Sequence, residues 1–234
     1  MAMLASSIAE DLRAAIAGAR YLPGDKLNEV AVASHYKVSR NTLREAFVTL
    51  AAEQLLVKIP NRGVFIASPD IDYIVDLYRA RANIEPAAAL WGEFLDVDYL
   101  VEQTNLAVQA LNDSDMEALS TCNQNFHRAL VNGVGSPTMD KEMSNLLARM
   151  RLTFLQVLPL YPELHAENVQ ENVKVAQLLA RDKRYEAAEM LRSNMMMNLY
   201  RIISVLRTAE HTRQYPAGAP HAVAPEDPQV PPVA

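Results

Sequence analysis

Val38-Ser-Arg-Asn-Thr-Leu-Arg-Glu-Ala-Phe-Val-Thr-Leu50 is predicted to form a short helix with one apolar face and one basic face. Ser39 is a suitable N-cap, because its hydroxyl can accept a hydrogen bond from a free amide of the first turn. The apolar residues recur with the spacing of a buried stripe, at Leu43, Ala46, Phe47 and Leu50. Arg40 and Arg44 project together near the helix N-terminus, where free amides also favour phosphate. A DNA recognition helix needs this arrangement, although the stretch alone is equally consistent with an ordinary solvated helix.

The residues on both sides of this helix are predicted to complete a small DNA-binding fold. Apolar residues recur every four positions from Leu4 to Ile16, and Asn28 can cap a second helix that ends near Tyr36. Two helices joined by so short a link form a helix-turn-helix. Two β-type runs at 55–59 and 64–67 flank a polar segment and predict a hairpin. Three helices and a two-stranded wing make a winged helix-turn-helix, in which Arg62 at the wing tip either contacts DNA or only adds solubility.

Composition favours a helical, cytoplasmic protein of two domains. The 234 residues are 50% hydrophobic and can bury two cores. The single cysteine, Cys122, excludes an intramolecular disulfide and is compatible with a reducing cytosol. We expect no membrane span, because no apolar run is long enough, and no secretory signal, because the N-terminus lacks the basic-then-apolar pattern of one. The net charge of −6 is unevenly distributed: residues 1–68 carry eight Lys/Arg against six Asp/Glu, so a DNA-facing part joined to an acidic part is expected.

Beyond Ser68 the pattern predicts an all-α bundle of six or so helices. Asp70 can cap the first of them, and Pro86 is expected to break or kink it. The further helices are predicted at 97–111, 116–132, 138–157, about 163–180 and 184–208. The Pro-, Ala- and Gly-rich end of the chain has no period and is expected to be disordered. The expected domains are a winged helix-turn-helix at 1–68, a helical domain at 69–212 and a tail at 213–234.

The first domain resembles the N-terminal domain of GntR-family bacterial transcription regulators. The motifs that carry this resemblance occur in the same order and spacing as in that family. They are Leu22-Pro-Gly-Asp-Lys-Leu27, Val38-Ser-Arg40, Leu43-Arg-Glu-Ala46 and Asn61-Arg-Gly63. The resemblance implies a set of residues that contact operator DNA, namely Ser39, Arg40, Thr42 and Arg44 on the helix with Arg62 and Gly63 in the wing. Val30 stands where many members carry an arginine, so one usual contact with phosphate or base is expected to be absent.

The second domain resembles the FadR-like branch of that family, which carries an all-helical effector-binding domain called FCD. The residues that carry this resemblance are Arg79-Ala-Arg81, Ile84-Glu-Pro86, Asn125-Phe-His-Arg128, Glu171-Asn172, Ala187-Ala188 and Asn194. The resemblance implies that a small effector binds inside the bundle and that the protein forms a homodimer.

Many members of that branch hold a divalent metal with one aspartate and three histidines. The corresponding positions here are Asn123, His127, Asn172 and Asn194, and only His127 keeps a strong ligand. Asn123 and His127 still share one helix face. A neutral amide, however, supplies neither the charge of a carboxylate nor the imidazole nitrogen that zinc or nickel prefers. We therefore expect no tightly bound metal and no other cofactor.

These four residues are candidates for contact with the effector, together with Arg81. Buried amides need hydrogen-bond partners, so the asparagines either line an effector pocket or bond one another and fixed waters. By resemblance, Arg81 often faces the pocket, and a guanidinium binds carboxylate in bidentate fashion. The alternative is a pair with Glu85 on the helix surface. If Arg81 faces inward, the effector is expected to be a small organic acid or another anion.

The sequence therefore predicts a ligand-responsive transcription repressor that binds double-stranded operator DNA as a homodimer, and not an enzyme. One alternative is a metal-dependent enzyme on a helical bundle, with His127 as its residual ligand or base. No nucleophile–base pair or pair of carboxylates accompanies that histidine in the sequence. A second alternative is an architectural DNA-binding protein without an effector.

Overall fold

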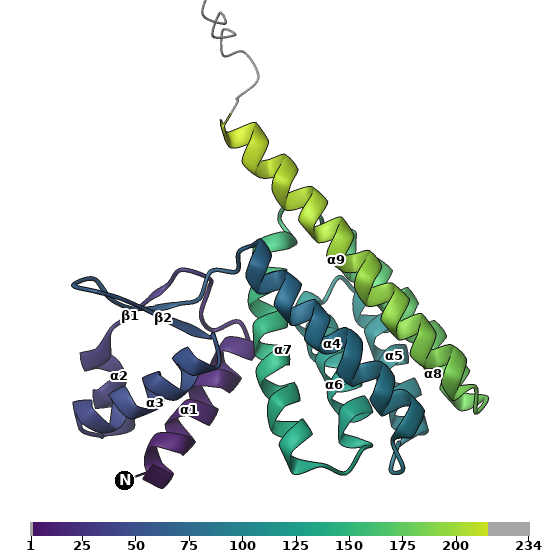
Figure 1. The fold of residues 1–234 in the computed structure, drawn as a ribbon, viewed down its shortest axis with the longest axis horizontal. Coiled ribbons are helices and arrows are strands. Elements are labelled where there is room, and N and C mark those ends of the chain that lie inside the picture. The colour runs from purple at the N-terminus through teal and green to yellow at the C-terminus, as the bar shows by residue number, and fades with distance from the viewer. Residues whose placement is uncertain (1, 215–234) are drawn as a thin grey trace, which may run out of the picture.

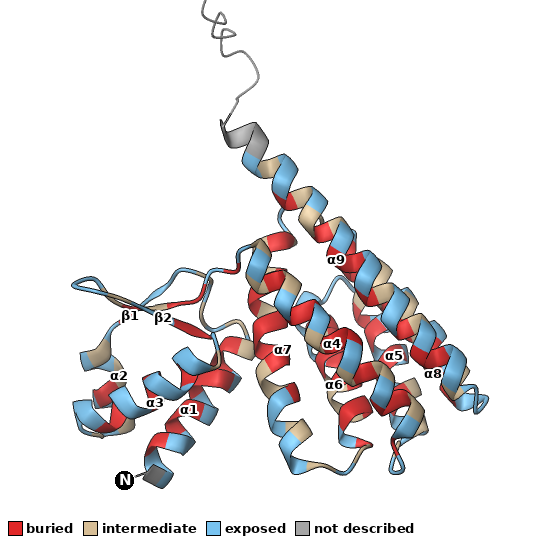
Figure 2. Ribbon diagram, in the orientation of Figure 1, coloured by how far each residue is buried: buried red, intermediate tan, exposed pale blue. Residues whose placement is uncertain are grey.

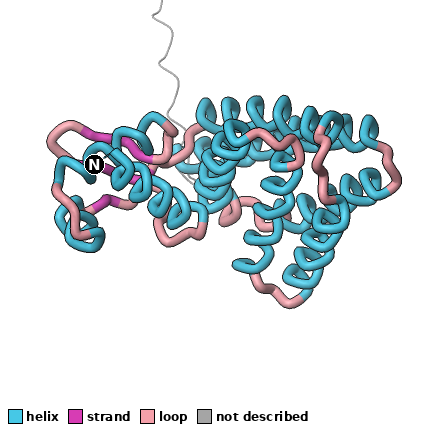
Figure 3. Tube along the Cα trace, turned by 90° about the horizontal axis from the view of Figure 1, so that it is seen from below, coloured by secondary structure: helices cyan, strands magenta, loops and turns pink. Residues whose placement is uncertain are grey.

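The computed structural model describes residues 2–214 and shows two parts (Figure 1). The head consists of α1 (Ala2–Ala17), β1 (Lys26–Leu27), α2 (Glu29–Tyr36), α3 (Arg40–Ala52), β2 (Leu56–Ile59) and β3 (Gly63–Ile66). The body consists of α4 (Ile71–Trp91), α5 (Val97–Asn112), α6 (Met116–Asn132), α7 (Pro137–Val157), α8 (Leu164–Ala180) and α9 (Arg184–Gln214). The expected winged helix-turn-helix followed by a helical bundle is confirmed, and Figure 3 shows the described strands gathered in the head. Within 2–214, no helix combines the length and apolar character needed to cross a membrane.

The wing contains one strand more than the sequence predicted. β3 pairs with β2 on one side, Val57 opposite Phe65, and with β1 on the other, Lys26 opposite Phe65, all antiparallel. A strand of two residues is too short to show an alternating pattern. Gly63 follows the wing tip with a φ of 112°, and a Cβ there would lie 3.2 Å from Cε of Lys26. Glycine therefore permits both the backbone conformation and the close approach of Lys26.

α3 has the predicted form. The hydroxyl of Ser39 accepts a hydrogen bond from the amide of Thr42 at 3.2 Å and so caps the helix. The predicted stripe is buried at 5% exposure or less, at Leu43, Ala46, Phe47 and Leu50. It belongs to one apolar cluster with Ile8, Leu12 and Ile16 of α1. Because this face is packed, Arg40 and Arg44 are left on the exposed face.

One predicted helix end needs correction, and one of the two outcomes expected at Pro86, a break of the helix, is absent. α4 runs from Ile71 to Trp91 without a break at Pro86. A proline inside a helix removes one hydrogen bond and costs about 3 kcal/mol. Residues around it, such as Ala82 and Ala88, are buried in the body core, where α4 packs along α9, so tertiary packing offsets that cost. α9 continues to Gln214, past its predicted end at 208, and the rest of the predicted tail lies outside the described residues.

The head and the body share a core. Ala148 and Leu152 of α7 are 0% exposed and belong to the same apolar cluster as Leu12 of α1. At the end of α1, the carbonyl of Ala17 accepts a hydrogen bond of 3.1 Å from Nε2 of Gln124 on α6. Figure 2 shows buried residues along both α1 and α7, which lie side by side. The head is therefore packed against the body rather than only tethered to it.

We expect Leu152→Ala to lower the free energy of unfolding by about 2–5 kcal/mol, because it leaves a cavity in the shared core. Urea denaturation followed by circular dichroism measures this change. Leu155→Ala on the same helix is the control, since Leu155 is only half-buried, and a smaller loss is expected. Equal losses in the two variants would contradict a shared core at Leu152.

Candidate functional site

A cleft of about 640 Å³ opens on the head between the first turns of α2 and α3 and the wing tip. Its lining consists of Lys26, Leu27, Asn28, Glu29, Val30, Arg40, Arg44, Asn61, Arg62 and Gly63. Four of these side chains are basic and one is acidic, so the cleft is positively charged although the whole chain is acidic. A concave basic surface beside a helix N-terminus is suited to a polyanion such as DNA.

The structure brings together four of the six predicted DNA-binding residues, Arg40, Arg44, Arg62 and Gly63. Ser39 is exposed but lies outside the cleft lining, and Thr42 is buried. The two hydroxyls lie 2.9 Å apart and complete the cap of α3. In this structure the hydroxyl of Thr42 faces Ser39, and contact of either residue with operator DNA stays a prediction.

Six residues of the cleft lining were not predicted to contact DNA, and three of them are Lys26, Glu29 and Val30. Lys26 reaches the cleft from β1, with Nζ 5.9 Å from the centre of the Phe65 ring. Glu29 forms an ion pair of 3.6 Å with Arg44, and Val30 lines the cleft beside it. The signal for Lys26 was present, because this residue belongs to the motif that spans 22–27.

The body contains a small polar cavity to which α4, α6, α7, α8 and α9 all contribute. All five predicted effector residues line it, namely Arg81, Asn123, His127, Asn172 and Asn194. Its volume of about 20 Å³ holds little more than one water molecule. Asn168 and Asn198 also line it, each four residues from a predicted asparagine, so helical spacing could have identified both.

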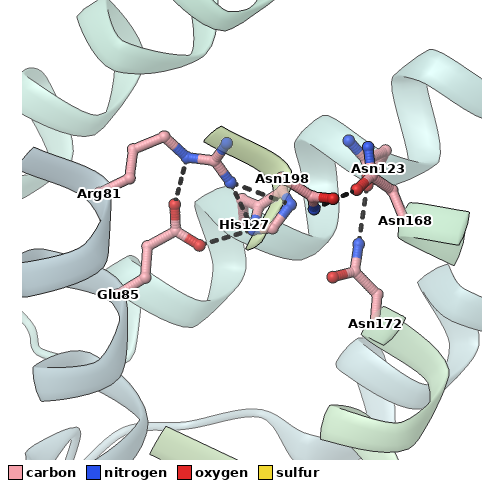
Figure 4. A network of polar contacts seen from close by, with 7 residues as sticks. All are labelled: Arg81, Glu85, Asn123, His127, Asn168, Asn172 and Asn198. Atoms are coloured by element: carbon pink, nitrogen blue, oxygen red, sulfur yellow. Dashed lines mark hydrogen bonds and ion pairs between the residues drawn. The ribbon is translucent and has the colours of Figure 1, made fainter. Parts of the chain in front are cut away.

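Two residues of the cavity lining, Arg81 and His127, belong to a buried network with Glu85 (Figure 4). Nε of Arg81 donates to Oε1 of Glu85 at 2.7 Å, and Nδ1 of His127 lies 2.6 Å from Oε2 of Glu85. Nη2 of Arg81 lies 3.3 Å from Nε2 of His127. The expected pair of Arg81 with Glu85 is therefore present, but it is buried in the body and not on a helix surface.

The protonation states of this network follow from its charges. Burial acts to raise the pKa of the Glu85 carboxyl, but Arg81 and then His127 outweigh it and bring the pKa to about 2. Burial is also the largest influence on His127, and it lowers the pKa of the imidazole below its ordinary value. A neutral imidazole is consistent with Nδ1–H donating to the carboxylate while Nε2 accepts from Arg81.

This arrangement does not fit the divalent metal of many FCD domains. Both nitrogens of His127 face hydrogen-bond partners, and one partner is the cationic group of Arg81, which would repel a metal ion. Oδ1 of Asn123 accepts a hydrogen bond from Nδ2 of Asn172 at 2.7 Å, so this carbonyl already has a partner. Across the described part of the chain, no group of three or more His, Cys, Asp or Glu side chains could hold a metal ion.

We expect Glu85→Gln to lower the free energy of unfolding by about 3–5 kcal/mol, because it leaves Arg81 buried without a counter-charge. The double variant Arg81→Met/Glu85→Leu removes both charges and should be less destabilised than the single variant. Urea denaturation of the wild type, Glu85→Gln and Arg81→Met/Glu85→Leu measures both effects. A double variant less stable than Glu85→Gln would contradict the account.

The pH dependence provides a separate check of the same network. The pKa of Glu85 falls from an ordinary value of 4.5 to about 2 in the folded protein. Ionised Glu85 therefore stabilises the fold above the unfolded pKa, and this stabilisation is lost as the pH falls through 4.5 toward 2. Over this pH interval the free energy of unfolding of the wild type should fall by more than that of Arg81→Met/Glu85→Leu. If the free energies of unfolding of the two proteins change in parallel with pH, this role for Glu85 is ruled out.

Comparison with known proteins gives two matches to protein families. Residues 4–66 match the bacterial regulatory proteins of the gntR family, and residues 76–196 match the FCD domain. The chain is 30% identical over 188 residues to the HTH-type transcriptional repressor GlaR of Escherichia coli strain K12, which covers 75% of this chain and 85% of that protein. It is 26% identical over 157 residues to the galactonate operon transcriptional repressor of the same strain, which covers 58% of this chain and 69% of that protein.

The fold is also similar to solved structures. A putative transcriptional regulator GntR from Rhodococcus sp. RHA1 superimposes with a TM-score of 0.75 at 27% identity. The alignment covers 86% of this chain and 97% of that protein, so it includes both the head and the body.

Proposed function

The chain belongs to the GntR family of bacterial transcription regulators and carries an FCD domain, and we propose that it is a repressor that leaves its operator when a small polar metabolite enters the body. The DNA-binding domain is residues 1–68 and the effector-binding and dimerisation domain is residues 69–212. The observation that carries the proposal is a basic cleft and a polar cavity on opposite sides of one shared core. The repressor names of GlaR and the galactonate operon regulator support the direction of control.

The head binds DNA through the first turns of α3 and through the wing. Arg40 and Arg44 are exposed at the N-terminal end of α3, from which recognition helices contact base edges in the major groove. Arg62 extends the basic surface at the wing tip toward the phosphate backbone. A homodimer places two such heads on a near-palindromic operator.

The effector is a small organic acid that binds at Arg81 without a metal. Nε of Arg81 is held by Glu85 and Nη2 faces His127, but no described residue forms a hydrogen bond with Nη1 (Figure 4). A carboxylate can accept a hydrogen bond from Nη1. Bidentate binding through both Nη1 and Nη2 would require His127 to move, because Nη2 faces that residue. The nearby carboxylate of Glu171 and the amide of Asn194 favour an acid that also carries hydroxyl groups.

The signal passes through α6 and α7, each of which contacts the cavity and the head. Met150 and Phe154 of α7 line the cavity, while Ala148 and Leu152 lie in the core of the head. On α6, Asn123 lines the cavity and the adjacent Gln124 bonds to the end of α1. Because the cavity holds about one water, an effector must move its walls apart, and movement of these two helices displaces α1.

Arg44→Ala is expected to abolish sequence-specific retardation of the operator, because it removes a hydrogen-bonding cation from the recognition helix. An operator is obtained by selecting duplexes from a random pool with the full chain, and binding is measured by gel retardation. Arg79→Ala is the matched control, since Arg79 is exposed on α4 of the body. Normal operator binding by Arg44→Ala would show that α3 is not the recognition helix.

Arg81→Met/Glu85→Leu is expected to bind the operator but to lose the response to effector, because Nη1 is absent. Thermal unfolding against a panel of hydroxylated organic acids measures binding, since a specific ligand stabilises the fold by mass action. At least one acid should raise the unfolding temperature of the wild type and release its operator. Lys183→Ala/Glu186→Ala, which removes an exposed ion pair, is the control and should respond like the wild type.

The carboxylate assignment is contradicted if no acid in the panel stabilises the wild type. It is also contradicted if the Arg81→Met/Glu85→Leu variant responds normally to an acid that releases the wild type.

A further inference from the structure

Val30 is an exposed apolar side chain in a cleft that is otherwise largely basic and polar. It is 57% exposed, and it lines the cleft together with Arg40 and Arg44. Oδ1 of Asn28 accepts hydrogen bonds from the amides of Val30 and Ala31, both at 3.1 Å. These two amides already have a hydrogen-bond partner in the cap, and the neighbouring side chains of Asn28 and Glu29 are engaged by the cap and by Arg44, so the isopropyl group of Val30 is the side chain of this turn left without such a contact.

Two contacts hold this turn of α2 beside the recognition helix. Glu29, the residue before Val30, forms its ion pair with Arg44 of α3. On the other side Leu27 is buried and pairs with Val64 in the wing sheet. Val30 therefore lies on the same surface as Arg44 and is positioned by both α3 and the wing.

The major groove offers few groups that favour an isopropyl side chain. Valine has no hydrogen-bond donor or acceptor beyond its backbone, so Val30 cannot distinguish bases by hydrogen bonding. The apolar group displayed on base edges is the 5-methyl of thymine. Contact between the two removes apolar surface of both partners from water, which is favourable.

We propose that Val30 determines operator specificity by contacting the 5-methyl group of a thymine, at a base pair next to those bound by Arg44. This inference rests on the proposed function, because it requires α3 and the cleft to face the major groove. It assigns to Val30 a preference for T·A where an arginine would prefer G·C. An apolar contact with deoxyribose, by contrast, would give affinity without a preference for any base.

The test replaces single thymines of a selected operator with deoxyuridine, which keeps the base pair and removes only the methyl group. With the full-length wild type, replacement at one position of the half-site should weaken binding about fourfold, the effect of one buried methyl group. Val30→Ala should bind the unmodified operator as weakly as the wild type binds the deoxyuridine operator. The same replacement should leave the affinity of Val30→Ala unchanged.

Val108→Ala is the matched control, because Val108 is a 38% exposed valine on α5 of the body, and it should retain the wild-type sensitivity to deoxyuridine. The inference is overturned if no deoxyuridine replacement weakens binding by the wild type, or if Val30→Ala keeps the sensitivity. It is also overturned if Val30→Ala weakens binding equally on every duplex, which indicates a sugar contact. If the wild type shows no sequence-specific binding to DNA, the proposed function itself is rejected. If it binds specifically but no thymine methyl group affects the affinity, only the role of Val30 is rejected.

Discussion

The packing of α7 into the core of the head is the contact on which the rest of the structure depends. Ala148 and Leu152 belong to the body by sequence but are fully buried in the apolar cluster of the head, where α7 packs on α1. A head joined only by the short segment after β3 would take many orientations, and events in the body could not bias its DNA-binding face. Because the core is shared and close-packed, a shift of α7 must be matched by α1. We propose this shared core as the physical basis for control of DNA binding by the body.

The polar interior of the body is organised around charges that compensate one another. Arg81 and Glu85 are both buried, and each lowers the cost of burying the other. His127, the one strong ligand left at the family's metal positions, is part of this network, and two of the three asparagines there bond each other. A cavity lined by amides and one partly free guanidinium group is suited to a ligand that brings its own hydrogen-bonding groups. We propose that such an effector, rather than a metal, completes the cavity.

Periodicity and capping residues predicted most of the fold, because local rules determine those features. The stripe of α3 and its Ser39 cap are examples, and so is the start of α4 after its Asp70 cap. The sequence did not reveal β1, whose two residues depend on pairing with β3. It also did not show that α4 continues through Pro86, because tertiary packing decides that outcome. For the sites, resemblance identified positions that converge on one cavity, but only the structure showed that Glu85 is buried beside Arg81 and that the hydroxyl of Thr42 faces Ser39.

Hydrogen exchange of the full chain with and without operator DNA tests the coupling of head and body most directly, because linkage between two sites is reciprocal. The account predicts slower amide exchange at 28–30, 40–44 and 61–63, where DNA covers the head. It also predicts altered exchange at 123–127 and 148–154, which line the cavity or join it to α1. Protection confined to the head, with unchanged exchange in α6 and α7, would contradict the claim that the shared core connects the cavity to the DNA-binding face.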